Sequence, residues 1–125
     1  MSIDSHVSRL IGWPPYPLPE LTVDLAIAGD DAVARLGGEL DADTACQLSA
    51  LVGRVLRQGE VRRLVLDMAG VSFLCAAGIT ALVRARSAVT DRGGVLVLRN
   101  PAPIVRRVLT ITGHHQWFPM NDAAA

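Results

Sequence analysis

Few side chains in this sequence have the types and spacing that catalysis requires. Asp41 and Asp67 each stand at the end of a predicted strand, and paired carboxylates can act as general acid and base. No nucleophile beside a base, no metal-ligand set and no glycine-rich phosphate loop accompanies them in the sequence. We therefore predict that the protein is not an enzyme and requires no cofactor.

The cysteines and histidines do not have the spacing of a metal site. Cys46 and Cys75 lack a second pair of ligands, and adjacent side chains such as His114 and His115 point to opposite faces of a strand. Cys46 and Cys75 each fall at the start of a predicted helix, at one edge of a predicted sheet. A redox pair is one interpretation, and two small buried thiols are the simpler one.

Charge is balanced overall but divided along the chain. The net charge of zero argues against nucleic acid as a partner. Residues 1–61 hold four arginines and nine acids (4 − 9 = −5), and residues 62–125 hold eight arginines and three acids (8 − 3 = +5). Composition bias is one explanation of the all-arginine basic set. The other is a partner-facing group consisting of Arg62, Arg63, Arg84, Arg86, Arg106 and Arg107.

Hydropathy predicts a cytoplasmic domain with its own core. Half of the 125 residues are hydrophobic, which is enough for a core without metal or disulfide. The uncharged apolar runs are far shorter than the roughly 18 residues that cross a bilayer, so no direct membrane insertion is expected. The first thirty residues lack a basic start followed by an apolar block.

The chain divides into a leader, a domain and a tail. Four prolines between Trp13 and Glu20 predict that residues 1–20 are a proline-rich, extended leader. The domain is predicted to span residues 21–121, and residues 122–125 are predicted to be a C-terminal tail.

Hydrophobic periodicity predicts the elements of this domain. Strands are expected at residues 21–27, 32–40, 61–67 and 95–98, with a short fifth strand at 117–120. Helices are expected at residues 43–58, 77–92 and 102–112. Asp41 or Asp43 is expected to cap the first helix, and Ile104 and Ile111 belong to the predicted buried face of the third. The order predicts an α/β fold, a mixed sheet of four or five strands with an antiparallel first pair and covering helices.

The strand at 61–67 is followed by a predicted turn at 68–72 and a loop at 73–78 that ends in Cys75-Ala76-Ala77-Gly78. This junction resembles the STAS domain of bacterial anti-sigma factor antagonists, whose loop reads Asp-Ser-Ser-Gly or Asp-Ser-Ala-Gly. The other matching segments are Gly38-Glu39-Leu40-Asp41 with Thr44-Ala45, Gly93-Gly94, and Val105-Arg106-Arg107-Val108-Leu109 before Gly113. The resemblance covers residues 21–121.

The resemblance implies a binding function with an altered switch. In that family an anti-sigma factor with a histidine-kinase-like ATPase fold binds this loop and phosphorylates its second serine, and the added charge disrupts docking. Alignment through Gly78 puts Ala77 at the acceptor position, Ala76 at the preceding serine and Cys75 at the aspartate. Because Ala77 has no oxygen, phosphoryl transfer cannot switch this site. Ser72 is expected to make a local backbone bond and Thr80 to be structural.

The implied partner-binding surface consists of Asp41, Thr44, Cys75, Ala76, Ala77 and Gly78. The leading hypothesis is an anti-sigma factor antagonist that docks an anti-sigma factor and frees a sigma factor without phosphorylation control. The alternative is an assembly subunit of an ABC-type lipid transport system, or another scaffold unrelated to sigma factors. Either hypothesis leaves the oligomeric state open.

Overall fold

The computed structural model describes residues 21–59 and 61–121. The predicted leader at 1–20 and tail at 122–125 lie outside the described residues. The elements in chain order are β1 (Leu21–Ala28), β2 (Asp31–Leu40), α2 (Ala45–Arg57), β3 (Arg63–Leu74), α3 (Ala76–Thr90), β4 (Val95–Arg99), α4 (Pro103–Ile111), the 3₁₀ helix η1 (His114–Trp117) and β5 (Met120–Asn121). The three predicted helices agree with α2, α3 and α4 to within two residues at each end.

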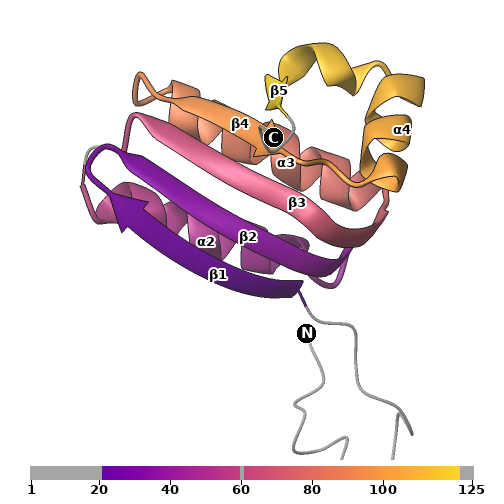
Figure 1. Cartoon of the computed structure of the whole chain (residues 1–125), viewed down its shortest axis with the longest axis horizontal. Coiled ribbons are helices and arrows are strands. Elements are labelled where there is room, and N and C mark those ends of the chain that lie inside the picture. Colours follow the sequence, from indigo (N-terminus) through magenta and orange to yellow (C-terminus); the bar gives the residue numbers. More distant parts are fainter. Residues whose placement is uncertain (1–20, 60, 122–125) are drawn as a thin grey trace, which may run out of the picture.

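The five strands form one mixed sheet in the order β1-β2-β3-β4-β5 (Figure 1). β1 pairs with β2 antiparallel, whereas β2, β3, β4 and β5 pair parallel to one another. Parallel neighbours require crossover connections, which α2 and α3 provide. The predicted mixed α/β sheet is confirmed.

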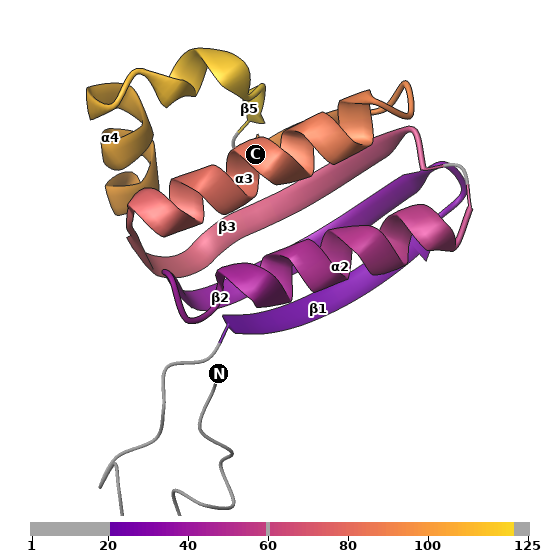
Figure 2. The same ribbon diagram turned by 180° about the vertical axis from the view of Figure 1, so that it is seen from behind.

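Helices α2 and α3 lie side by side over one face of the sheet (Figure 2). The strand register aligns Ala34, Leu66 and Leu98 across this face, and each of the three is fully buried. The apolar faces of α2 and α3 close the core above them through Leu48, Leu51, Val55, Leu82 and Val89. Helix α4 lies past the end of β4, where it packs against the longer strand β3.

The opposite face of the sheet carries a row of alternating charges. Across this row Asp24 on β1 is opposite Arg35 on β2, followed by Asp67 on β3 and Arg99 on β4. The Arg99 guanidinium lies 3.2 Å from Asp67 Oδ2, and Asp67 is nearly buried. Asp67 was predicted to end a strand near the loop; it lies instead in the middle of β3, and its carboxylate belongs to this ladder.

Strand β3 is much longer than predicted. The turn expected at 68–72 and the start of the loop at Phe73 are wrong, because the strand continues to Leu74. β2 extends equally far, and the pairs Glu39–Phe73 and Leu40–Leu74 hold the far end of the ladder. The β2–β3 pairing has two register shifts, one between Arg35 and Gly37 and one between Gly38 and Glu39. These irregularities accommodate residues of β3 whose types favour a turn without ending the strand.

The C-terminal part also differs from the prediction. Trp117 lies in η1 rather than in a strand, and β5 contains only Met120 and Asn121. The indole of Trp117 is covered by Arg86 of α3, whose guanidinium carbon is 5.3 Å from the ring centroid. Ile104 and Ile111 are exposed, because α4 is short and meets the core through Val105 and Leu109.

Candidate partner-binding site

The turn between β2 and α2 is held by Asp41 and Thr44. Asp41 Oδ1 accepts the backbone N–H groups of Asp43 (2.9 Å) and Thr44 (3.1 Å). The Thr44 hydroxyl donates to the carbonyl of Glu39 at 2.7 Å and accepts the N–H of Asp41 at 3.0 Å. Thr44 is completely buried. The predicted capping of α2 by Asp41 or Asp43 is wrong, since the Asp41 carboxylate stabilises the turn before the helix.

The second segment of the site is the junction between β3 and α3. Cys75 alone separates Leu74, which ends β3, from Ala76, which begins α3. The N–H of Cys75 donates to the carbonyl of Leu40 at 3.2 Å. This bond connects the end of β2 to the start of α3, and it therefore places Cys75 beside the Asp41 turn.

Gly78 allows the close approach of these two segments. It is buried in the first turn of α3, and a Cβ atom there would collide with the carbonyl oxygen of Leu40 and lie 2.8 Å from Leu74 Cδ1. A backbone oxygen cannot rotate out of the way as a side chain can. The family glycine therefore serves packing, and it sets the distance between α3 and the Asp41 turn.

A shallow groove runs from this junction along the space between α2 and α3. The α2 side contributes small side chains and the α3 side ends in an arginine; the lining consists of Ala42, Ala45, Cys46, Ser49, Ala77, Thr80, Ala81 and Arg84. Small side chains permit the backbone of a partner to approach closely. The junction and this groove together form the candidate site.

The structure places the six predicted surface residues in two adjoining segments but does not expose all of them. Ala76 is exposed, Asp41, Cys75 and Ala77 are half-buried, and Thr44 and Gly78 are buried. Thr44 and Gly78 therefore position the surface, and only the others can contact a partner. Cys46 is exposed and Cys75 is half-buried, both as free thiols. The interpretation as two small buried thiols is therefore wrong, and their pairing remains a prediction.

Two side chains beside the site were missed in the sequence. Phe73 is 46% exposed directly before the junction, and Arg84 lines the far part of the groove. The signal for Phe73 was the alternation of strand residues, because Leu74 is buried and its neighbour must point to the other face. The predicted turn hid that signal.

The hydroxyl groups of Ser72 and Thr80 both donate to backbone carbonyls. The Ser72 hydroxyl donates to the carbonyl of Gly38 on β2 at 3.3 Å, so its bond crosses strands rather than being local as predicted. The Thr80 hydroxyl donates to the carbonyl of Ala76 at 3.1 Å, in agreement with a structural role. Neither of them occupies the acceptor position in the loop.

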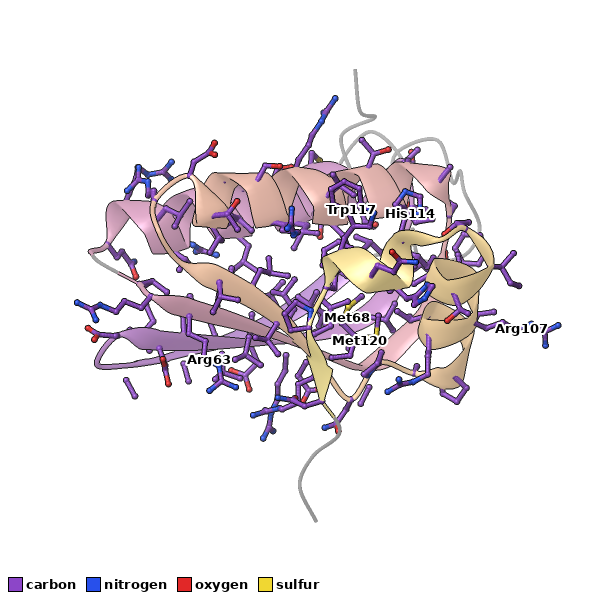
Figure 3. All side chains as sticks on the ribbon, turned by 90° about the horizontal axis from the view of Figure 1, so that it is seen from above. Arg63, Met68, Arg107, His114, Trp117 and Met120 are labelled. Atoms are coloured by element: carbon purple, nitrogen blue, oxygen red, sulfur yellow. The ribbon has the colours of Figure 1, made fainter. Side chains whose placement is uncertain are left out.

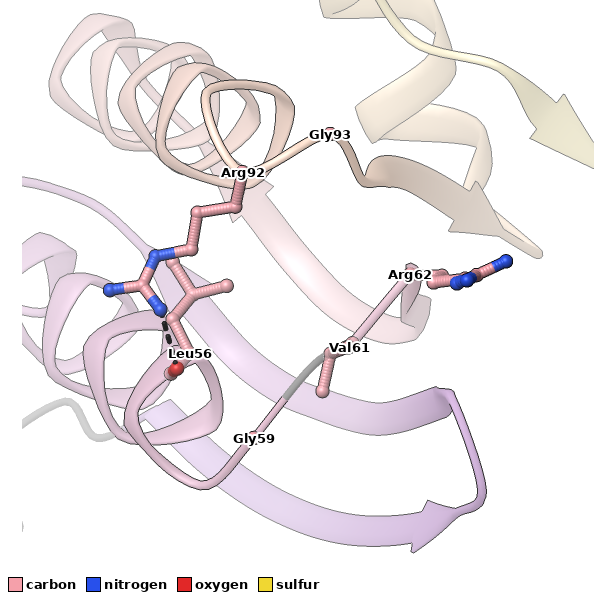
Figure 4. A pocket seen from close by; sticks show the side chains of 6 residues that line it. All are labelled: Leu56, Gly59, Val61, Arg62, Arg92 and Gly93. Carbon is pink, nitrogen blue, oxygen red and sulfur yellow. Dashed lines mark hydrogen bonds between the residues drawn. The ribbon is translucent and has the colours of Figure 1, made fainter.

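A second hollow lies at the opposite end of the helix pair (Figure 4), lined by Leu56, Gly59, Val61, Arg62, Arg92 and Gly93. The Arg92 guanidinium in this hollow stabilises the fold, because it donates to the carbonyl of Leu56 near the end of α2 at 2.8 Å. Arg62 points away from Arg92 toward the solvent. This hollow is a helix end stabilised by an arginine side chain.

The arginines that were predicted as one partner-facing group do not gather. Arg63 on β3 and Arg107 on α4 lie at opposite ends of the molecule (Figure 3).

Residues 21–59 and 61–121 contain no cluster of three metal-ligating side chains. None of the helices described in these ranges has the length and apolar character to cross a membrane.

Comparison with known proteins identifies the fold. The family model of the STAS domain matches residues 22–125. The chain belongs to the STAS domain family. The match includes the β2–α2 turn, the β3–α3 junction and the groove between α2 and α3, so the candidate site lies within the matched STAS domain.

Several similar proteins are named as antagonists of anti-sigma factors. The anti-sigma F factor antagonist of Lysinibacillus sphaericus is 29% identical over 97 residues, which is 78% of this chain and 81% of the relative. The putative anti-sigma factor antagonist BtrV of Bordetella bronchiseptica is 32% identical over 91 residues, or 73% and 78% of the two chains. The structure of unphosphorylated SpoIIAA, an anti-sigma factor antagonist, superposes with a TM-score of 0.70 at 28% identity and covers 82% of this chain and 89% of SpoIIAA.

Proposed function

We propose that this STAS domain is an anti-sigma factor antagonist that acts by binding an anti-sigma factor of the histidine-kinase-like ATPase class. Its relatives bear the name of that function. Such a protein works by occupying its partner, so the expected activity is binding rather than catalysis. A soluble, cytoplasmic protein fits this role.

The proposed contact surface is the β3–α3 junction together with the Asp41 turn. The observation that carries the proposal is the hydrogen bond from the Cys75 N–H to the carbonyl of Leu40, which joins both segments into one surface. Ala76 and Phe73 offer exposed apolar groups there. Apolar contacts surrounded by polar groups are typical of the centres of protein interfaces.

The proposed difference from an ordinary antagonist is a permanent, unphosphorylated state. Ala77 stands at the acceptor position implied by the family loop, and its methyl group cannot accept a phosphoryl group. The Ser72 and Thr80 hydroxyls are bonded to backbone carbonyls. The antagonist would then be regulated by its amount or its partner's state, because the usual charge-based release is missing.

The kinase reaction tests this part of the proposal. Three proteins are compared: the wild type, the Ala77→Ser variant and the Ala77→Ser/Cys75→Asp double variant. Each is incubated with ATP and with the anti-sigma kinase that binds the wild type, and the phosphopeptides are then mapped. We expect no phosphate on the wild type, little on Ala77→Ser because the loop aspartate is absent, and the most on the double variant. A phosphate on Ser72 or Thr80 of the wild type would contradict the unswitched state.

A further inference from the structure

Within residues 21–59 and 61–121, no strand pairs with the outer edge of β1. β1 occupies one end of the strand order and spans eight residues. Proline, lysine and β-bulges commonly prevent such edges from pairing with another chain. β1 contains no proline or lysine, and it pairs with β2 without a register shift. Its one charged residue is Asp24. Val23 and Ile27 are 36% and 44% exposed, so the edge is also apolar on its helix side.

A hollow adjoins this edge. It lies between β1 and α2 and is lined by Val23, Gln47, Ala50, Leu51, Arg54 and Arg57. An apolar side chain that enters from beyond β1 would contact Val23 and Leu51 and lie along the aliphatic stems of the two arginines. The edge therefore offers backbone groups for strand pairing and an apolar recess for the side chains of an added strand.

We infer that β1 is the interface between two copies of this chain, which pair antiparallel about a two-fold axis at Leu25. A continuous sheet requires residues of the helix side to face each other across the junction. With the axis at Leu25, Val23 of each copy is opposite Ile27 of the other, and Leu25 is opposite Leu25. The apolar residues of the edge are thus complementary to themselves, as a two-fold interface demands.

Charge selects this register among the neighbouring ones. An axis at Asp24 would place two carboxylates directly opposite each other, which is destabilising. With the axis at Leu25, Asp24 is opposite Ala26 of the second copy, while Arg35 faces Asp24 from the other side within its own sheet. An axis at Ala26 would pair only residues 24–28, whereas the axis at Leu25 pairs residues 22–28.

This dimer is independent of the proposed function, and it leaves the candidate site open. The groove of that site lies between α2 and α3, whereas β1 runs along the outer side of α2 (Figure 2). Each dimer would therefore present two copies of the site.

Sedimentation of the full chain between about 5 and 500 μM tests the interface. We expect a concentration-dependent dimer, and we expect Ile27→Lys to weaken it at least tenfold because the ammonium would be buried against Val23. Val95→Lys is the matched control, since Val95 is 39% exposed on β4, away from β1. A wild type that is monomeric at 500 μM would overturn the inference, as would a dimer that Val95→Lys disrupts and Ile27→Lys does not.

Cross-linking tests the register. In a Cys46→Ser/Cys75→Ser background, Leu25→Cys should form a symmetric disulfide, because directly opposite residues have Cα atoms about 4.5–5.5 Å apart. Val23→Cys should not, because the two copies of residue 23 would be offset by four positions, or about 13 Å. Equal oxidation rates for the two variants would refute the Leu25 axis.

Discussion

Substitution of Gly78 by alanine should destabilise the domain and loosen the binding surface together. Alanine would normally stabilise a helix relative to glycine by about 1 kcal/mol. At Gly78, however, the added Cβ would collide with the Leu40 carbonyl, lie 2.8 Å from Leu74 Cδ1 and lie 3.0 Å from Leu40 Cγ. One of the groups in contact is backbone and cannot be moved by a rotamer change.

The expected size of the effect follows from these two opposing terms. Overpacking of a core costs about 1–3 kcal/mol, and a backbone collision favours the upper end of that range. Subtracting the helix preference leaves a loss of about 2 kcal/mol. For a domain of this size, that loss lowers the melting temperature by about 10 °C.

Urea denaturation and thermal melts followed by circular dichroism measure the loss. Gly53→Ala in α2 is the matched control, because its Cβ would meet only the flexible end of Arg57, at 3.2 Å from Nη1. We expect that variant to gain up to about 1 kcal/mol. Hydrogen exchange of the Cys75 amide should accelerate in Gly78→Ala, since its acceptor is the same Leu40 carbonyl.

The pair of variants can refute the proposed role of Gly78. If Gly78→Ala melts at or above the wild type while Gly53→Ala is stabilised, the close approach of α3 to Leu40 does not exist. A loss of stability without faster exchange at Cys75 would mean that the strain is absorbed elsewhere in α3.

Two further substitutions test the polar groups that hold the fold. Thr44→Val should lower the free energy of unfolding by about 1–3 kcal/mol, because it leaves the Glu39 carbonyl and the Asp41 N–H without their buried partner. Its control, Thr80→Val on the exposed face of α3, should change that free energy by no more than about 0.5 kcal/mol. Asp67→Asn should cost about 1–3 kcal/mol, because it removes the charge opposite Arg99, whereas Asp30→Asn, in a solvent-exposed pair, should change stability by less than about 1 kcal/mol. Denaturant midpoints measure all four, and equal losses in each variant and its control would contradict the assigned bonds.

The order of elements could be predicted because local patterns and tertiary packing agree in most of the chain. The apolar spacing of α2 and the continuous apolar run of Leu64-Val65-Leu66 correspond to the helix layer and to a central strand. The antiparallel first pair followed from the turn residues between β1 and β2. These features depend on neighbours in sequence.

The sequence-based predictions failed where contacts between residues distant in the sequence determine the structure. Gly70 and Ser72 favour a turn locally, but the length of β2 provides pairing partners that keep β3 extended to Leu74. Asp67 looked like a site residue until its register with Arg99 on β4 was known. Ile104 and Ile111 fit a helical stripe, yet the short α4 reaches the core only through Val105 and Leu109.

The candidate site was only partly predictable for the same reason. Asp41 and the Cys75–Gly78 segment could be named from the sequence. The buried roles of Thr44 and Gly78 required the carbonyls of Glu39 and Leu40, to which they are bonded or packed. Periodicity alone does not specify such contacts.

Titration of the anti-sigma factors of the source organism, each purified separately, tests the central claim most directly. Wild type is compared with Ala77→Glu at the junction and with Ser87→Glu, an exposed position of α3 outside the lining of the groove and of the hollow beside β1. Ala77 is the second residue of α3, whose first turn has no acidic residue, so a glutamate there should leave the melting temperature equal or slightly higher. We predict that one anti-sigma factor binds the wild type and Ser87→Glu alike, and that Ala77→Glu weakens binding at least tenfold, or about 1.4 kcal/mol. Equal affinity of all three chains, or binding of none of the anti-sigma factors to the wild type, would contradict the account.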